Sequence, residues 1–554
     1  MITNQLTEVR LLSVPLEKDY KHTFYFTSKE EQANYFIDCH QAYDGSQQLK
    51  MSEASYQRKE GYIRFSSHAD LLQHCNYLMF KNPNHLDKWF YGFITHIEYK
   101  SDEVSWIFFE LDVIQSYLFD YTVLPSFVER EHVASDVAGE HTVPEGLECG
   151  EFISTYDSNV SELLDISTVI GVSETLDLGI NSKEKTERGN KYGGLFSGIH
   201  YYVFPSTATV KDLTKFIKAY DDGGKSDGIS CIFTAPSFIA PEGSQGFIDN
   251  GNGLVDDQDL EVRHVLESSE PQSLDYVINK TITENPESYG HQIRNNKLKT
   301  FPFKYLLVSN NNGGAAIYKY EDFSEGEMTF KIYGVLTPGG SIRLIPCDYK
   351  KSGENNEEGL NLGKFPICNW TSDIYTNWLT QNSVNIGLNI ASGVGQIIAG
   401  TAIAVGSAGL GTAVGGGSVV GGVSTIANQL AQIHQMSFTP PQSRGNTNCG
   451  DVITATNNNT FTFYAMTIRP EVARIIDGYF DMFGYKVNSV KIPESNHRES
   501  YWFTKTIDVT IHAEIPQNHL EKIKGCYNNG ITFWKDTANI GDYSVSNLPL
   551  SDKE

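Results

Sequence analysis

The chain has 554 residues, more than one hydrophobic core usually organises, so we expect about two to four domains. Its formal net charge of -25 disfavours a conventional nucleic-acid binder, because such proteins gain affinity by neutralising phosphates. A conduit that DNA must pass without sticking would suit an acidic chain. The eight cysteines form no C-x-x-C pair, which argues against a zinc module or a disulfide framework and fits synthesis in a reducing cytoplasm. The N-terminal residues lack the pattern of a signal peptide, so we do not expect secretion by that route.

The composition favours a mainly β fold with α+β insertions, since Tyr, Phe and turn-forming Asn and Gly are abundant. In residues 1–150, β-branched and aromatic residues with polar alternates predict a β-rich N-terminal domain. The strands expected there are Val9–Val14, His22–Phe26, Tyr62–Phe65, Trp89–Ile97 and Val104–Asp112. Short helices are expected at Ser28–Phe36 and His68–Cys75. A polar stretch from Glu129 to Gly146 closes this domain.

Residues 151–255 resemble a small α/β module. Strands are predicted at Ile166–Val172, Gly198–Phe204 and Ile229–Thr234. Between the last two, five apolar residues fall on one helical face, which Gly223 and Gly224 terminate. These residues are Val210, Leu213, Phe216, Ile217 and Tyr220.

A second β-rich domain is expected in two parts, residues 256–373 and 445–554. Strands are predicted at Phe301–Ser309, Met328–Leu336, Ile342–Ile345, Thr460–Thr467 and Tyr501–Ile511. A helix begins near Pro470 and ends before Gly484. Its predicted apolar face consists of Val472, Ile475, Ile476, Tyr479, Phe480 and Phe483.

Residues 374–444 form the segment that carries most information about function. From Ile374 to Ser443, 70 consecutive residues include no Asp, Glu, Lys or Arg, although 20% of the whole chain is charged. Its glycines, each costing about 1 kcal/mol in a helix interior, disfavour a core helix and interrupt every candidate membrane span. Its apolar residues disfavour a solvated linker. A buried core hairpin stays open, but we favour a membrane-active loop that is shielded until it is needed.

Such a loop could enter a bilayer without moving a charge across it. Small residues at Gly411-x-x-x-Gly415 and Gly417-x-x-x-Gly421 would permit close helix approach. The outgoing arm is ambiguous between helix and strand. The turn is assigned to Gly415, Gly416 and Gly417. The apolar residues assigned to the loop are Ile386, Leu388, Ile390, Val394, Ile397, Ile398, Ile403, Val405, Leu410, Val414, Val419, Val420, Val423, Ile426 and Leu430.

Patterns that suggest catalysis or metal binding fail on inspection. Gly224-Lys225-Ser226 imitates the end of a P-loop and part of a nucleophile elbow, but a helix precedes it and a strand follows, the reverse of what the elbow requires. Asp249–Gly253 lacks the alternating ligands of a calcium loop. Glu131, His132 and His141 fit no metal-binding spacing and are expected to be solvated loop residues. We therefore predict no catalytic site, no metal and no cofactor.

Several stretches resemble the tail knob, or distal tube, proteins of small podoviruses that infect Gram-positive bacteria. The likeness spans nearly the whole chain and is weakest in residues 151–255. It is carried by Phe127–Val133, Glu140–Leu147, Asn295–Phe303, Ser309–Gly313, Ser372–Trp378, Ile468–Ala473, Asp477–Phe480, Phe483–Tyr485 and Asn529–Trp534.

The resemblance implies a non-enzymatic virion protein at the distal end of the tail. It implies a homohexameric tube that joins the lower collar proteins and passes viral DNA without sequence-specific binding. It also implies that the uncharged loops, here Asn382 to Gln432, plug the channel and then form a pore in the host cell membrane. Two alternatives are an enzyme that degrades cell wall or polysaccharide, and a receptor-binding adhesin. The enzyme would need two carboxylates about 5 to 9 Å apart in an open cleft. The adhesin would need an aromatic pocket, expected in residues 151–255.

Overall fold

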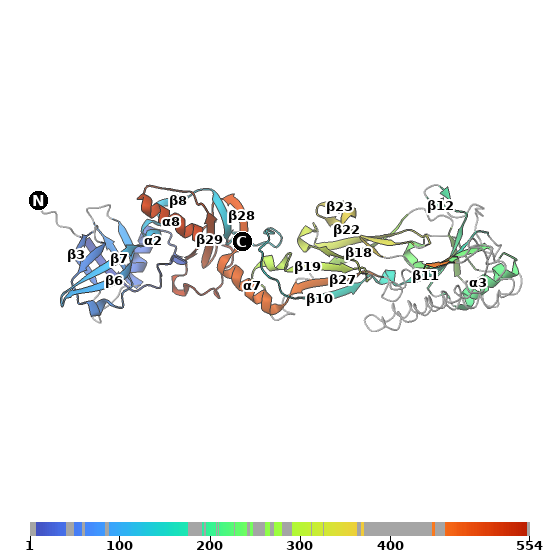
Figure 1. Cartoon of the computed structure of the whole chain (residues 1–554), viewed down its shortest axis with the longest axis horizontal. Helices are drawn as coiled ribbons and strands as arrows, with labels where there is room; N and C mark the ends of the chain where they lie inside the picture. The colour runs from blue at the N-terminus through green and yellow to red at the C-terminus, as the bar shows by residue number, and fades with distance from the viewer. Residues whose placement is uncertain are drawn as a thin grey trace. The chain divides into compact units, whose positions relative to one another are not determined.

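The structure is a computed structural model of the chain, shown in Figure 1. The residues that it describes are 7–39, 49–57, 61–82, 88–174, 191–192, 195–206, 208, 210–225, 228–240, 244–247, 261–265, 271–279, 291–311, 313–324, 326–338, 340–362, 367–369, 446–448 and 460–550.

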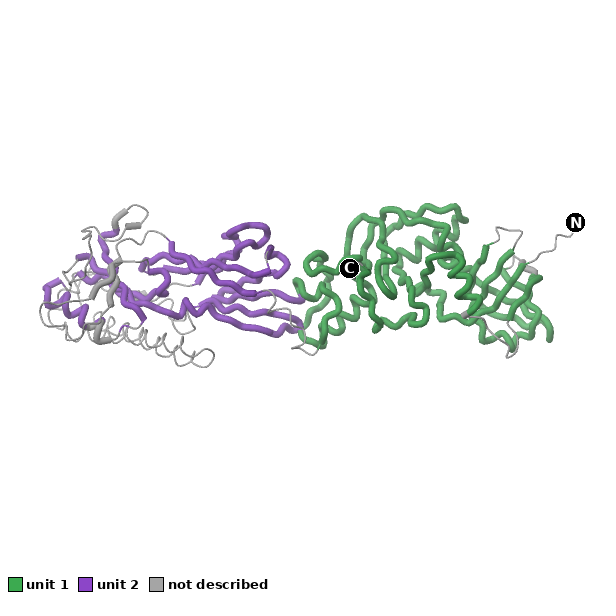
Figure 2. Tube along the Cα trace, turned by 180° about the vertical axis from the view of Figure 1, so that it is seen from behind, with its two compact units in different colours: residues 1–150, 289–302, 469–554 green, residues 151–288, 303–468 purple. Residues whose placement is uncertain are grey.

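The chain forms two compact units, and each is assembled from distant stretches of sequence (Figure 2). Unit 1 consists of Met1–Gly150, Tyr289–Pro302 and Arg469–Glu554. Unit 2 consists of Glu151–Ser288 and Phe303–Ile468. The backbone therefore passes from one unit to the other four times. The finer division into five parts that we expect from the sequence stays a prediction.

Unit 1 begins with a closed antiparallel barrel. Its strands, in spatial order, are β1 (Thr7–Leu12), β3 (Lys50–Gln57), β4 (Tyr62–Phe65), β7 (Val104–Leu111), β6 (Trp89–Ser101) and β5 (Tyr77–Lys81). Alternate side chains point inward, as the period of a strand requires, so Val9 and Leu11 of β1 meet Ile63, Leu78 and Ile107 in the barrel core. Strand closure leaves this sheet without free edges.

A second sheet in unit 1 combines strands from both ends of the chain. Its order is β2 (His22–Phe24), β31 (Ile531–Trp534), β29 (Tyr501–Ile507), β9 (Ser126–Glu131) and β28 (Tyr485–Lys491). Only the pairing of β2 with β31 is parallel among these strands. A short hairpin-like pair joins β8 (Tyr121–Val123) to β30 (Ile511–Ala513).

Of four α-helices described in unit 1, three have clear local causes. In α1 (Lys29–Asn34) Ser28 accepts from the amide of Glu31, whose carboxylate accepts from the amide of Thr27. Asp112 caps α2 (Val113–Tyr117). The other two are α7 (Pro470–Phe483), which starts at its proline, and α8 (Gln517–Asn529). Phe483 of α7 contacts Phe503 of β29, whereas α8 packs against Trp502, so the two helices use different residues of one strand.

Unit 2 is also built mainly from antiparallel strands. One sheet has the order β10 (Phe152–Asn159), β27 (Thr462–Ile468), β19 (Lys304–Ser309) and β20 (Ala315–Tyr318). Another has the order β18 (Gln272–Asn279), β21 (Glu327–Gly334), β22 (Ile342–Tyr349) and β23 (Ser352–Glu354), with β24 (Leu360–Leu362) also paired to β22. Phe330, Leu344 and Phe463 lie in the core that these two sheets share.

The remaining large sheet of unit 2 contains all three strands predicted for residues 151–255. Its order is β16 (Ser244–Phe247), β17 (Glu261–Val265), β14 (His200–Phe204), β11 (Ile166–Val172), β15 (Ile229–Pro236), β25 (Ile367–Asn369) and β26 (Asn446–Asn448). The helix α3 (Val210–Asp222) packs Phe216 against Tyr202 and Phe204 of β14. A small pair joins β12 (Lys191–Tyr192) to β13 (Leu195–Phe196). Because β25 and β26 come from far along the chain, this sheet is not confined to residues 151–255.

The expectation of a β-rich chain is confirmed, and several predicted elements are found at their predicted positions. The strand Tyr62–Phe65 has the predicted bounds, and the helix from Pro470 ends before Gly484 as expected. Two predictions are wrong. The strand expected at Tyr501–Ile511 is broken at Asp508, whose φ is 53°. Ile475, assigned to the apolar face of α7, is 72% exposed, while Ala473, Ile476 and Phe480 face the core.

Candidate functional site

All the residues assigned to the membrane-active loop, from Ile386 to Leu430 and including the glycine turn Gly415–Gly417, lie outside the described residues. Their assignment therefore stays a prediction. Among the described residues, no helix combines the length and the hydrophobicity needed to span a membrane.

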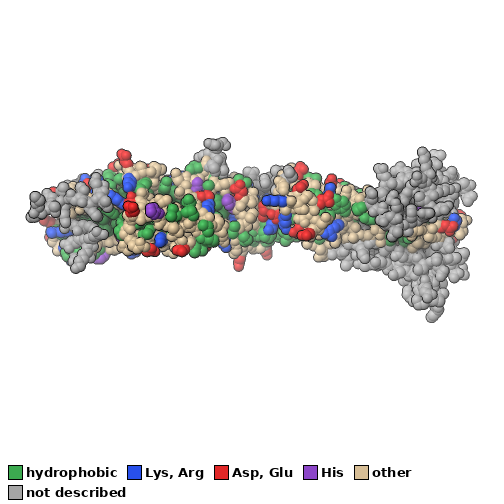
Figure 3. Space-filling model, turned by 90° about the horizontal axis from the view of Figure 1, so that it is seen from above, with side chains coloured by type: hydrophobic (Ala, Val, Ile, Leu, Met, Phe, Trp, Pro, Cys, Tyr) green, Lys and Arg blue, Asp and Glu red, His purple; other side chains and the backbone are tan. Residues whose placement is uncertain are grey.

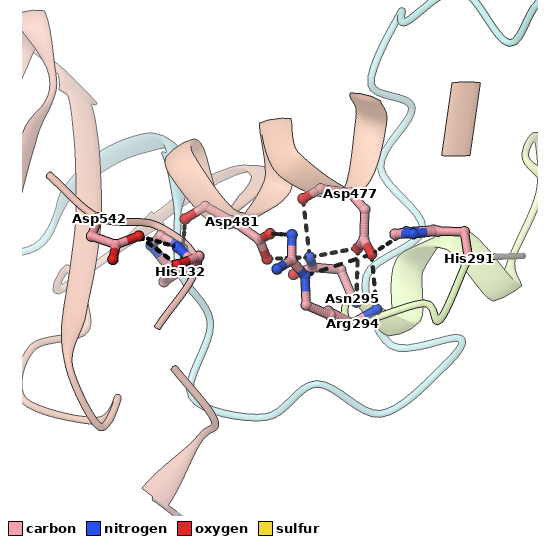
Figure 4. A network of polar contacts seen from close by, with 8 residues as sticks. His132, His291, Arg294, Asn295, Asp477, Asp481 and Asp542 are labelled. Carbon is pink, nitrogen blue, oxygen red and sulfur yellow. Dashed lines mark hydrogen bonds and ion pairs between the residues drawn. The ribbon is translucent and has the colours of Figure 1, made fainter. Parts of the chain in front are cut away.

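Within the described residues, several of the stretches that carry the family resemblance meet in a buried polar network of unit 1, part of which is shown in Figure 4. Its centre is Asp477, a fully buried carboxylate on the inner side of α7. One oxygen, Oδ1, accepts from the backbone N and the side-chain Nδ2 of Asn295 at 3.0 and 2.8 Å. The other, Oδ2, accepts from the backbone N of Arg294 at 2.9 Å and lies 2.8 Å from Nε2 of His291. Asp477 thus fixes the segment 291–295 onto α7.

Asp481, one helical turn after Asp477, extends the network along α7. Its Oδ1 accepts from Nδ2 of Asn295 at 2.8 Å, and its carboxylate forms an ion pair with Arg294. Burial raises the pKa of Asp481, although the hydrogen bond from Asn295 and the charge of Arg294 oppose this. The spacing of four residues places both carboxylates on one face of the helix.

Glu145 holds a second group of charges next to the first. Its side chain is 1% exposed and forms ion pairs with Arg130 of β9 and with Lys297. Its Oε1 also accepts from the backbone N of Lys486 at 2.9 Å. Burial lowers the pKa of Lys297, and the bond and charge of Glu145 oppose that shift. One carboxylate therefore joins three separate stretches of the chain.

Asp136 and Tyr485 connect these two groups. The hydroxyl of Tyr485 donates to Oδ1 of Asp136 at 2.6 Å, and Oδ2 accepts from the backbone N of Asn296 at 3.2 Å. Burial raises the pKa of Asp136, partly offset by these two bonds. Each carboxylate of the network described so far accepts bonds from donors on other segments, which is how buried charges are tolerated.

Glu131 and His132, expected to be solvated loop residues, are instead buried at the end of β9, so that expectation is wrong. Glu131 pairs with Lys491 at 2.7 Å. The Nδ1 of His132 accepts from the backbone N of Phe503 at 2.7 Å, so Nε2 carries the proton and donates to the carbonyl of Asp481 at 3.0 Å. Burial and then the charge of Arg498 lower the pKa of His132 well below its usual value, which keeps the ring neutral.

This network is suited to holding chain segments together. Its carboxylates are engaged by lysine, arginine, amide and hydroxyl donors, and no group of three or more His, Cys, Asp or Glu side chains in the described residues could hold a metal ion. The sequence indicated these stretches, but not that their side chains meet in one buried network. The available signal was the unusual density of charged and amide residues inside otherwise apolar motifs, such as Arg130 and Glu131 in Phe127–Val133.

A cleft of about 1160 Å³ also lies in unit 1, between residues of the barrel and of α8. The aromatic rings of Trp89, Phe90 and Phe119 line it, together with Asp120. Burial raises the pKa of Asp120, but its bonds to Lys88 and Lys29 outweigh burial and lower the pKa overall. A carboxylate with a lowered pKa is unsuited to act as the general acid that glycoside cleavage requires. The pocket that an adhesin would need in residues 151–255 stays a prediction.

Comparison with known protein families identifies the chain. Residues 270–548, just over half of its length, match the family model described as the C-terminal domain of tail knob protein gp9 of Bacillus phage phi29. The chain belongs to this tail knob family. Residues 5–122 of the tail knob chain, which include the barrel, match a second model described as the N-terminus of the caudoviral major tail protein.

Curated relatives and a solved structure agree with this identification. The tail knob chain is 26% identical to tail knob protein gp9 of Bacillus phage phi29 over 607 aligned positions, covering 98% of each chain. It is 27% identical to tail knob protein gp9 of Bacillus phage PZA, again covering 98% of each. Its fold is similar to the tail knob protein gp12 of bacteriophage C1, with a TM-score of 0.65, 14% identity, and coverage of 98% of this chain and 100% of that one. The resemblance inferred from the sequence is confirmed, and the protein has a structural role in the tail of a podophage virion.

Proposed function

We propose that six copies of this tail knob subunit form a closed tube at the distal end of the tail, attached to the lower collar. The tube is the conduit through which viral DNA leaves the virion. In a chain with a net charge of -25, a wall of six subunits repels phosphate and so does not retain the passing DNA. Membership of the tail knob family supports the structural part of this proposal.

In this proposal the uncharged segments plug the tube before infection and then enter the host cell membrane as a pore. The observation that carries this step is the run of 70 residues without a charged side chain inside an otherwise acidic protein. Moving a charged side chain to the bilayer centre is costly, whereas the small and apolar residues of this run cross without that penalty.

A single charge in the middle of the run tests the membrane step. An Asp at a bilayer centre costs about 2.5 to 3.5 kcal/mol, so six copies of Ile403→Asp would cost on the order of 15 to 20 kcal/mol per pore. We expect Ile403→Asp tubes to assemble but not to make liposomes leak, and Ile403→Leu tubes to cause leakage like the wild type. Equal leakage by the two variants would show that this stretch does not cross the bilayer, and would favour a buried plug or core hairpin.

A further inference from the structure

The helix α7 carries apolar side chains on two faces, and only one of them is covered. The inner residues Ala473, Ile476 and Phe480 are buried in unit 1. On the outer side, Ile475 is 72% exposed and Met482, seven residues later, is 37% exposed. A helix that is apolar on more than one side is normally buried on those sides, so the outer face of α7 is expected to be covered in the assembled protein.

This outer face forms a shallow groove of about 490 Å³. Ile475, Gly478, Tyr479 and Met482 line it from the helix, at spacings that place them on one stripe. A side chain added at Gly478 would meet nothing within 4 Å, so the glycine leaves open space in the groove. Figure 3 shows hydrophobic side chains exposed between charged ones on one face of the molecule.

The margin of the groove carries a positive charge that no other described residue pairs. Arg294 lines the groove but forms an ion pair with Asp481. Arg474 also lines it and is exposed, and no hydrogen bond or ion pair to another described residue engages it. The groove therefore favours an apolar partner that brings an acidic group.

A second exposed apolar patch in unit 1 has the matching character. Val490 of β28 and Ile507 of β29 both pair with Phe127 of β9, so the three side chains form a row on one face of the sheet. Phe127 is 36% exposed, Val490 71% and Ile507 53%. Asp508, exposed and free of ion pairs within the described chain, directly follows Ile507. This row thus combines apolar surface with an acidic group that no described residue pairs.

We propose that the α7 groove of one subunit receives the Phe127–Val490–Ile507 row of a second copy of the chain. A ring needs a heterologous interface, in which two different patches of the same subunit meet on neighbouring copies. The groove and the row are both in unit 1, so every copy carries both halves. Arg474 and Asp508, neither of them paired by another described residue, have opposite charges. This interface rests on the proposed tube and names the surfaces that close it.

Two glutamate variants and their mixture test the interface, with mass photometry and sedimentation of the full-length chain as readouts. Ile475→Glu damages the groove and Val490→Glu damages the row. We expect closed oligomers from the wild type and monomers from either variant alone. In a 1:1 mixture, the Val490→Glu subunit still has an intact groove and the Ile475→Glu subunit still has an intact row. These two surfaces can pair once, so we expect dimers. Rings should not form, because the other two surfaces of each dimer are damaged. Leu71→Glu, at a barrel residue that is 49% exposed, is the control and should still form rings.

Each other result has a distinct meaning. A wild-type chain that stays monomeric at all concentrations tested would overturn the proposed tube and this interface together. If both glutamate variants formed rings, the proposed interface would be wrong while the proposed tube would stand. If those rings then failed to join tails, the groove would instead bind another tail protein. Monomers in the mixture would overturn the pairing of the groove with the row. Unchanged circular dichroism spectra and melting temperatures exclude misfolding as the cause of lost assembly.

Discussion

At the scale of single residues, Asp477 shows how buried charge fixes the path of the chain. Its carboxylate is fully buried and accepts from Arg294 and Asn295 while it also contacts His291. An asparagine at this position would place its NH₂ group, a hydrogen-bond donor, against N–H groups that also donate. We expect Asp477→Asn to lower the free energy of unfolding by about 2 to 4 kcal/mol. Urea denaturation of the full chain measures this.

The matched control is Asp542→Asn. Asp542 is exposed and bonds to Ser544, so its replacement should leave the denaturation midpoint unchanged. If both variants unfolded at the same urea concentration as the wild type, the network would contribute nothing measurable to the stability of unit 1.

His497 gives this unit a specific dependence on pH. Burial lowers its pKa to about 4, with a further effect of Arg498, while the charge of Glu494 acts in the opposite direction. The unfolded chain, with a histidine pKa of about 6.5, therefore binds the proton first. Stability contributed by the neutral ring is present above pH 6.5 and is lost as the pH falls toward 4, by at most about 1.4 kcal/mol per pH unit.

The variant His497→Gln isolates this effect from other titrating groups. Burial raises the pKa of Asp112 to about 6, so Asp112 stabilises the fold on acidification and partly masks the histidine in the wild type. We therefore expect the difference in unfolding free energy, wild type minus variant, to fall between pH 7 and pH 4.5. A difference that stays constant over this range would contradict the assignment. Denaturation curves at each pH provide the measurement.

At the scale of secondary-structure elements, Gly484 decides how α7 leads into β28. Its φ is +62°, and a Cβ built there would lie 2.2 Å from the carbonyl oxygen of Glu131. Both the backbone conformation and the contact exclude a side chain. We expect Gly484→Ala to destabilise unit 1 by more than about 3 kcal/mol, or to prevent its folding. Thermal unfolding followed by circular dichroism tests this.

Gly525 in α8 is the opposite case. No atom lies within 4 Å of a Cβ placed there, and its backbone is helical. Gly525→Ala should therefore raise stability by about 0.5 to 1 kcal/mol, because alanine favours helix. If Gly484→Ala were as stable as Gly525→Ala, the turn after α7 would not require glycine.

The helix α7 also shows which structural features local sequence signals predict and which they do not. Pro470 and Gly484 predict the limits of α7 because they act locally on the backbone. The apolar periodicity of the helix wrongly predicted that Ile475 is buried. Periodicity alone does not distinguish an apolar residue at the edge of the buried stripe, within about 100° of it around the helix axis, from a residue inside the stripe. The burial of Glu131 and His132 was missed for a related reason. Polar residues are buried only when partners from distant segments arrive, here Lys491 and Phe503.

At the scale of the whole molecule, the uncharged segment can be separated from the tube that we propose. Replacing residues 382–432 by a short Gly/Ser bridge should leave both units folded, because loop length is a weak entropic contribution. Such particles should assemble tails and adsorb, yet fail to deliver DNA in infection assays. A second variant, in which an uncharged polar linker of the same length replaces residues 382–432, serves as a control. It fills the channel to a similar extent but lacks the apolar residues of the native segment. Normal infectivity of either particle would contradict the role proposed for this segment.

The family, the β-rich character, many strand positions and the uncharged run could all be inferred from the amino-acid sequence alone. These depend on composition, on local period and on turn residues, all of which act over a few positions. The three-dimensional fold was needed to show that residues 1–150, 289–302 and 469–554 form one unit, and that Glu145 and Asp477 join its segments. Strand pairing and ion pairing across hundreds of residues leave no local periodicity, because each partner is specified by its position in space and not by its neighbours in the chain.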